Sequence, residues 1–203
     1  MIRNLIVFGL VIIIGLVSSV EAYADMPPME RKKTEQTFRF GAIKIVQSFN
    51  SIRDPKSPEF KVRVFKGDKL LLQLSDAFCG NFFAAPNQLL FVGLSNTGWP
   101  GTAVIVFDDS GRILLLADHN AAQFDYCEET PTLLKQWYDD KNPEVQFHLP
   151  NAGKEIKPSI SVRDCRGGTV DLLDAVLNAN ARGEKTIHDA IELLLYIPKR
   201  GAK

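Results

Sequence analysis

The segment that most constrains the fold is a hairpin whose two strands are apolar on both faces. It joins residues 103–107 to residues 112–116 through Asp, Ser and Gly at 108–111, which are residue types that tolerate turn backbone angles. A strand with one face in water alternates apolar and polar residues, whereas a strand buried on both sides does not. We therefore expect a sheet whose centre is covered on both faces, with the C-terminal segments supplying the second cover.

Earlier segments alternate as half-buried strands do. Residues 37–45 have period-two character, and residues 60–64 and 70–74 form a predicted hairpin around a tight turn at 66–69. Further along, residues 130–138 are predicted to form a short helix, with Thr130 as the N-cap and Pro131 at the favoured first position.

Two segments near the C-terminus, residues 171–182 and 187–197, show the apolar spacing of amphipathic helices. The predicted fold class is therefore α+β, an antiparallel β-meander sheet with short helices, in which the two C-terminal helices pack on one face. An all-β sandwich with a helical tail is the alternative.

The N-terminus has the pattern of a secretory signal peptide. Arg3 precedes an apolar run over residues 5–17, and small residues at Ala22 and Ala24 predict cleavage near Ala24. A retained membrane anchor is the alternative, although the run is shorter than the roughly 20 residues that a spanning helix needs. We expect a signal peptide over 1–24, a flexible arm over 25–36 and a single globular domain over 37–203, located in the periplasm or secreted.

Charge and hydropathy indicate little about partners. The chain has 24 Lys and Arg against 24 Asp and Glu, so no basic excess favours nucleic acid or an anionic membrane surface. A second apolar run of membrane length is lacking, so no membrane span is expected after leader removal. The sequence does not indicate an oligomeric state.

The three cysteines, Cys79, Cys127 and Cys165, predict one disulfide, because an oxidising compartment favours bridging and an odd count leaves one thiol over. In a meander, the segment with Cys127 and the turn with Cys165 lie at the same end of the sheet. Strand parity therefore favours Cys127–Cys165. A Cys79–Cys127 disulfide is the alternative, because the connection over residues 117–126 is long enough to cross the sheet.

Catalytic and metal motifs are weak. The histidines do not have ligand spacing, and neither a metal nor another cofactor is expected. Cys79 precedes His119 in the order that papain-like hydrolases use, which gives a periplasmic cysteine hydrolase as an alternative function. Nothing after Cys79 looks helical, so no helix N-terminus is available to lower the pKa of its thiol. The prediction leans away from an enzyme.

Aromatic residues in predicted loops are the remaining candidates for a site. They either form a recognition surface or pack beneath the loops. The function predicted is that of an exported, non-enzymatic protein that binds a protein partner in the cell envelope, as inhibitors, immunity proteins and assembly accessories do. A small-ligand or glycan-binding module is a further alternative. The candidate recognition residues are Phe78, Phe82, Phe83 and Trp99.

Overall fold

The computed structural model describes residues 30–98, 101–119, 122, 124–130, 134–148 and 159–177. Antiparallel strands dominate, at 57% strand, and one short helix is present among these residues. The first sheet has the order β1-β2-β3-β4 and the second has the order β5-β6-β7-β8, so both are simple meanders. The strands of the first sheet are β1 (Lys33–Phe40), β2 (Ile43–Asn50), β3 (Glu59–Lys66) and β4 (Lys69–Ser75). Those of the second are β5 (Asn81–Ala84), β6 (Leu90–Leu94), β7 (Thr102–Asp108) and β8 (Ile113–Asp118).

The C-terminal half of the described chain forms a small ribbon and a third sheet of order β11-β12-β13. The ribbon consists of β9 (Glu128–Glu129) and β10 (Lys135–Gln136). The third sheet consists of β11 (Val145–His148), β12 (Ser159–Arg163) and β13 (Thr169–Asp171), and α1 (Leu172–Leu177) follows it directly. Asp171 caps this helix, since its carboxylate accepts a hydrogen bond of 2.9 Å from the backbone N–H of Leu173.

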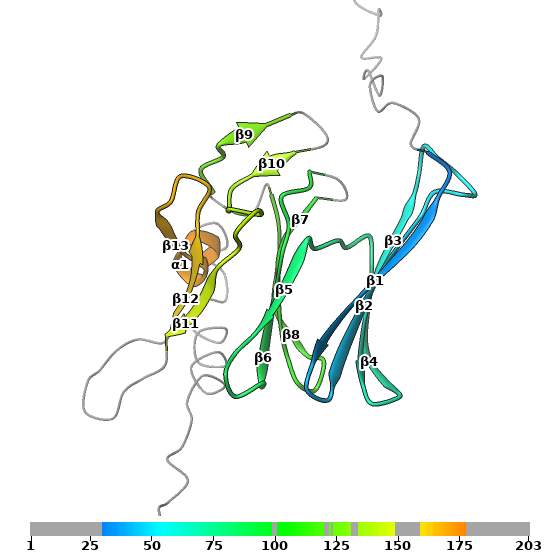
Figure 1. Cartoon of the computed structure of the whole chain (residues 1–203), viewed down its shortest axis with the longest axis horizontal. Coiled ribbons are helices and arrows are strands. Elements are labelled where there is room, and N and C mark those ends of the chain that lie inside the picture. The colour runs from blue at the N-terminus through cyan, green and yellow to red at the C-terminus, as the bar shows by residue number, and fades with distance from the viewer. Residues whose placement is uncertain are drawn as a thin grey trace, which may run out of the picture.

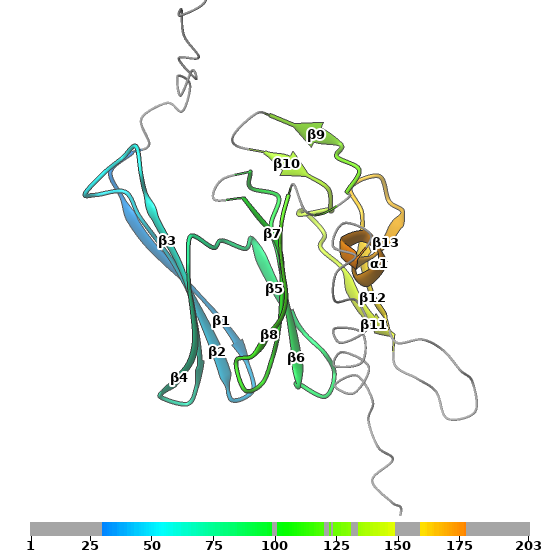
Figure 2. The ribbon, with the colours of Figure 1, turned by 180° about the vertical axis from the view of Figure 1, so that it is seen from behind.

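The sheets stack as three layers, with β5–β8 in the middle (Figure 1). The sheet β1–β4 covers one face of the middle sheet, and β11–β13 with α1 covers the other (Figure 2). Every residue of β6 and β7 is buried. The expectation of a sheet whose centre is covered on both faces is confirmed, although β8, the second of the two apolar strands that led to it, leaves Ile113 and Leu116 exposed.

Alternate residues of the middle strands enter two separate cores, as the period of two requires. Phe91, Ile105 and Phe107 face the first sheet, where Ile45 and Val64 meet them. The opposite face of the middle sheet packs against the third layer. That second core contains Leu90, Val92, Val104, Val106, Trp137, Tyr138, Ile160, Val162, Leu172 and Leu173.

Contacts at the β7–β8 turn join the first two layers. Gly111 has a positive φ of 86°, and a Cβ at this position would come within 2.7 Å of the Leu71 Cβ on β4. Lys66 and Asp109 form an ion pair of 2.8 Å beside it. The turn therefore needs glycine both for its backbone angle and for its close approach to β4.

A buried asparagine ties the middle layer to the third. Asn96 donates from Nδ2 to the Tyr138 carbonyl at 3.0 Å, and its Oδ1 accepts from the Trp137 N–H at 3.1 Å. The Trp137 indole Nε1 donates to the Ser95 carbonyl at 2.9 Å, and its ring stacks on Phe124 with centroids 3.8 Å apart. Residues 137–138 are thus held in an extended conformation between the middle sheet and the third sheet.

The α+β prediction is wrong, although α1 lies within the helix predicted over 171–182. Residues 134–138 are extended where a helix over 130–138 was expected, because β10 pairs with β9. In addition, Asn96 Oδ1 accepts hydrogen bonds from the backbone N–H groups of Trp137 and Tyr138, which a helix would use internally. A third sheet, rather than two C-terminal helices, covers the middle layer, and α1 is the one helix among the described residues. The segment predicted as a helix over 187–197 lies outside them, as does the rest of the helical tail of the alternative fold. Residues 33–36, assigned to an arm, belong to β1.

Candidate functional site

Charge is segregated along the chain and therefore between the layers. Residues 30–75, which include the first sheet, contain eleven Lys and Arg but five Asp and Glu. Residues 76–177 contain seven Lys and Arg and fourteen Asp and Glu. The first layer thus has a formal excess of six positive charges, and the segment that follows has an excess of seven negative ones. The balanced total conceals a strongly polarised molecule.

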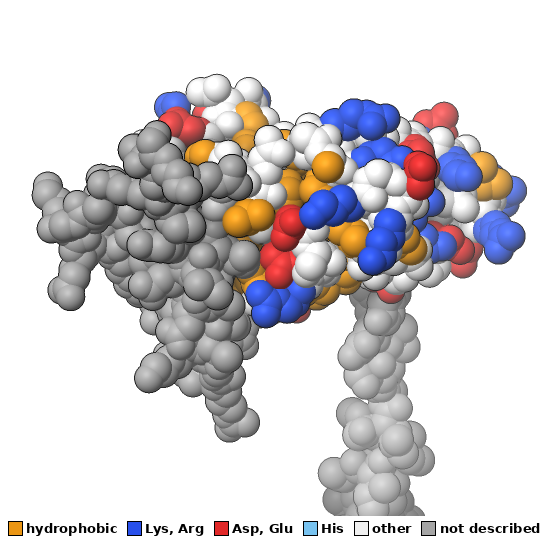
Figure 3. Space-filling model, turned by 90° about the horizontal axis from the view of Figure 1, so that it is seen from below, with side chains coloured by type: hydrophobic (Ala, Val, Ile, Leu, Met, Phe, Trp, Pro, Cys, Tyr) orange, Lys and Arg blue, Asp and Glu red, His pale blue; other side chains and the backbone are white. Residues whose placement is uncertain are grey.

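The outer face of the first sheet concentrates these cations. Strand register places Thr37, Val46, Arg63 and Gln73 in one row across the sheet, and alternate residues on either side share that face. Figure 3 shows Lys and Arg side chains gathered at the side of the molecule where β1–β4 lies. The cations that the register assigns to this basic face are Lys33, Arg39, Lys44, Lys61 and Arg63.

Two of these cations have carboxylate partners. Lys61 pairs with Glu59 at 3.0 Å, and Arg63 with Glu35 at 2.9 Å. Within the described part of the chain, no salt bridge involves the other three cations of the basic face, Lys33, Arg39 and Lys44.

Two of the unpaired cations stand directly opposite each other. Arg39 on β1 faces Lys44 on β2 across the strand pair. Like charges in directly opposite positions destabilise a sheet, so this arrangement costs stability. The ammonium of Lys44 lies 4.8 Å from the Phe65 ring centroid, and the exposed Leu70 is opposite Phe65 on β4. The basic face therefore combines uncompensated positive charge with accessible apolar surface.

Cys79 and His119 do not form a catalytic pair. Cys79 is a free thiol with 0% exposure in the first core, and burial strongly raises its pKa. A nucleophilic cysteine needs access and a lowered pKa. His119, at the end of β8, instead lies beside Tyr126, whose hydroxyl donates to the His119 carbonyl at 2.8 Å. This environment argues against a cysteine hydrolase.

His119 is itself buried. Its Nδ1 lies 3.5 Å from the Tyr126 hydroxyl, and its backbone N–H donates to the Gly101 carbonyl at 2.9 Å. Burial lowers the pKa of His119 to about 4, because the charged imidazolium loses hydration. The side chain is therefore neutral at physiological pH and takes part in packing at the end of the middle sheet.

The aromatic residues singled out as recognition candidates make packing contacts. The buried Phe82 ring meets Phe38 edge-on at 5.0 Å in the first core. Phe78 meets Phe60 at 5.9 Å, and the partly buried Phe83 packs against the second core. Trp99 lies outside the described residues.

A disulfide joins Cys127 to Cys165, which is the pairing that strand parity favoured, and Cys79 is left as the free thiol. The Cys165 N–H donates to the Trp137 carbonyl at 3.1 Å and the Cys127 N–H to the Gln136 carbonyl at 2.8 Å, so both cysteines of the disulfide are hydrogen-bonded to the same short stretch of backbone. A disulfide is compatible with a location outside the cytosol.

The described residues contain no cluster of His, Cys, Asp and Glu that could hold a metal ion. Nor does this part of the chain contain a helix long and apolar enough to cross a membrane.

The balanced total charge of the whole chain does not reveal the basic face. A count by segment indicates the excess of cations, since the first β-rich stretch alone has more than twice as many cations as carboxylates, and strand register then assigns them to one face. Comparison with known proteins adds no likeness: the chain matches no protein-family model, no curated protein and no solved structure. Any functional conclusion therefore depends on the geometry and charge of the described residues.

Proposed function

We propose that this chain is an exported, non-enzymatic protein that binds an acidic protein partner in the cell envelope through the basic face of β1–β4. The observation that carries the proposal is the opposed pair Arg39 and Lys44, which has no salt-bridging carboxylate among the described residues. Such a pair costs folding stability, and a negatively charged partner offsets that cost on binding.

A protein partner suits the mixture of groups on this face. Half-buried Phe65 and exposed Leu70 lie among the cations, and aromatic and arginine side chains are enriched at protein interfaces. The acidic charge of the remaining layers gives the molecule a strong charge asymmetry, which would orient it toward an acidic partner during encounter. Export follows from the predicted signal peptide with cleavage near Ala24, and the disulfide is consistent with it.

A triple substitution, Lys33→Gln, Arg39→Gln and Lys44→Gln, tests the proposal. The matched control replaces three exposed cations elsewhere, Arg53→Gln, Lys56→Gln and Lys141→Gln. Each purified protein is immobilised and incubated with envelope extract at low and physiological salt. We expect the wild type and the control to retain the same acidic protein, and the face variant to bind it at least about tenfold more weakly.

Stability provides an internal check. Because the face variant relieves like-charge repulsion, it should unfold at the same urea concentration as the wild type or a higher one. Equal recovery of the partner by the face variant would contradict the proposal. So would wild-type binding to vesicles containing anionic lipid with no protein retained, since that result would assign the face to a membrane surface.

A further inference from the structure

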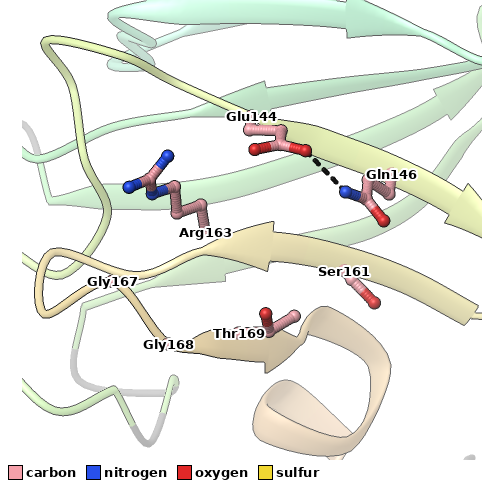
Figure 4. A pocket seen from close by; sticks show the side chains of 7 residues that line it. All are labelled: Glu144, Gln146, Ser161, Arg163, Gly167, Gly168 and Thr169. Carbon is pink, nitrogen blue, oxygen red and sulfur yellow. Dashed lines mark hydrogen bonds between the residues drawn. The ribbon is translucent and has the colours of Figure 1, made fainter.

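The outer face of the third sheet contains a polar hollow. Strand alternation sends Ile160 and Val162 into the second core and turns Ser161 and Arg163 outward. The hollow on this face has a volume of about 230 Å³ and combines side chains from all three strands (Figure 4). Its lining residues are Glu144, Gln146, Ser161, Arg163, Gly167, Gly168 and Thr169.

Opposite charges line this hollow without pairing. Thr169 is the cross-strand partner of Arg163, and the backbone N–H of Arg163 donates to the Glu144 carbonyl, so these three residues form one row. The Glu144 carboxylate accepts a hydrogen bond of 2.5 Å from Gln146 Nε2. No salt bridge to Arg163 occurs among the described residues. Figure 4 shows the Arg163 guanidinium directed away from the Glu144–Gln146 pair.

The hollow has free space where Gly167 lines it, because a Cβ added at this residue would meet nothing within 4 Å. A guanidinium presents a planar fork of donors that matches a carboxylate, and the adjacent Thr169 hydroxyl is a second donor. On the other side, Glu144 can accept from an ammonium or an amide N–H. The volume is below the roughly 300–1,000 Å³ of sites for drug-sized ligands and suits a single amino-acid unit.

We propose that this hollow binds the carboxylate end of an amino-acid unit, with Arg163 and Thr169 holding the carboxylate and Glu144 holding the nitrogen group beside it. The chemistry is shared by a free α-amino acid, which presents an ammonium, and by a peptide C-terminus, which presents an amide N–H. A few hydrogen bonds to so small a ligand give an affinity of about 1 mM. The site lies on the layer opposite the basic face and does not depend on that proposal.

Backbone amide shifts in NMR spectra of the full-length mature protein provide the test. The probes are alanine, alanylalanine and alaninamide, which lacks the carboxylate. We expect alanine or alanylalanine to shift amides of β11–β13 saturably, and alaninamide to leave them unchanged. Binding of alanine alone assigns the site to free amino acids, and binding of alanylalanine alone assigns it to peptide C-termini.

Variants separate a built site from general charge attraction. Arg163→Gln should weaken binding at least about tenfold, and Arg163→Lys should fall between it and the wild type, because lysine keeps the charge and loses the fork. Lys141→Gln, which removes an exposed cation nearby in the sequence, should leave binding unchanged. Absence of saturable shifts with both carboxylate probes, equal binding of alaninamide, or full binding by a folded Arg163→Gln would each overturn the inference.

Discussion

The Asn96 side chain offers the sharpest test of how the middle and third layers are held together. Replacing it by alanine removes the acceptor for the Trp137 N–H at 3.1 Å and the donor to the Tyr138 carbonyl at 3.0 Å. Both aromatic residues are 1% exposed, so water cannot easily substitute. Each buried backbone group left without a partner costs about 1–3 kcal/mol, so Asn96→Ala should lower the free energy of unfolding by about 4 kcal/mol.

That loss is a large part of the 5–15 kcal/mol by which domains are typically stable. With a urea m-value of about 2 kcal/mol/M, the midpoint should fall by about 2 M. Tryptophan fluorescence and far-UV circular dichroism follow the transition. Asn50→Ala is the matched control, because Asn50 accepts one exposed hydrogen bond of 3.2 Å from Ile52, and its loss should cost less than about 1 kcal/mol. If Asn96→Ala lowers the free energy of unfolding no more than Asn50→Ala does, the hydrogen bonds of Asn96 to residues 137–138 are not what joins these layers.

Three other predictions concern the thiols and His119. Cys79 should resist alkylation in the native protein and react as a single thiol per chain in denaturant, because burial removes access and raises its pKa; rapid native modification would contradict this environment. Replacing both Cys127 and Cys165 by serine should lower the free energy of unfolding by about 4 kcal/mol, since the bond spans a sequence separation of 38 residues; a urea midpoint equal to that of the oxidised wild type would refute this. The pKa of His119 is lowered from its ordinary value of 6.5 to about 4 in the folded protein. Between pH 6.5 and pH 4, the imidazole therefore binds a proton in the unfolded chain but not in the folded one. Stability should therefore decrease as pH falls through that window, and a folded His119→Gln variant should show a flatter urea midpoint against pH.

Several strand positions were predictable from the pattern of side chains, although the strand predicted over residues 37–45 is divided by the turn between β1 and β2. The hairpin predicted from residues 60–64, which alternate, and residues 70–74 corresponds to β3–β4. The uniformly apolar strands around residues 108–111 correspond to β7–β8. The burial of β7 on both faces was predictable from its composition, because a strand covered on both sides has no polar face. The equally apolar β8 lies at the edge of the sheet and leaves Ile113 and Leu116 exposed.

Features set by long-range contacts were not predictable in the same way. The segment before Tyr138 has good local helix signals, but Asn96, forty-two residues earlier, binds its backbone and holds it extended. The alternation of residues 144–149 and 159–162 does indicate the strands β11 and β12, but a short alternating strand does not show which sheet it joins or which face it covers. The cover of the middle layer was therefore assigned to the helical spacing that follows these strands. The basic face needed strand register, because only the pairing places Arg39 opposite Lys44.

Site-specific photo-crosslinking in cells is the most direct test of binding through the first sheet. A photoreactive residue replaces Thr37 or Gln73, which are exposed, uncharged and in one row of the basic face, so all the cations remain. The control places it at exposed Asn142, in the third layer. Binding through β1–β4 predicts adducts with one acidic envelope protein from positions 37 and 73 and none with that protein from position 142. Adducts from position 142 alone, or no protein adduct from either face position, would contradict it.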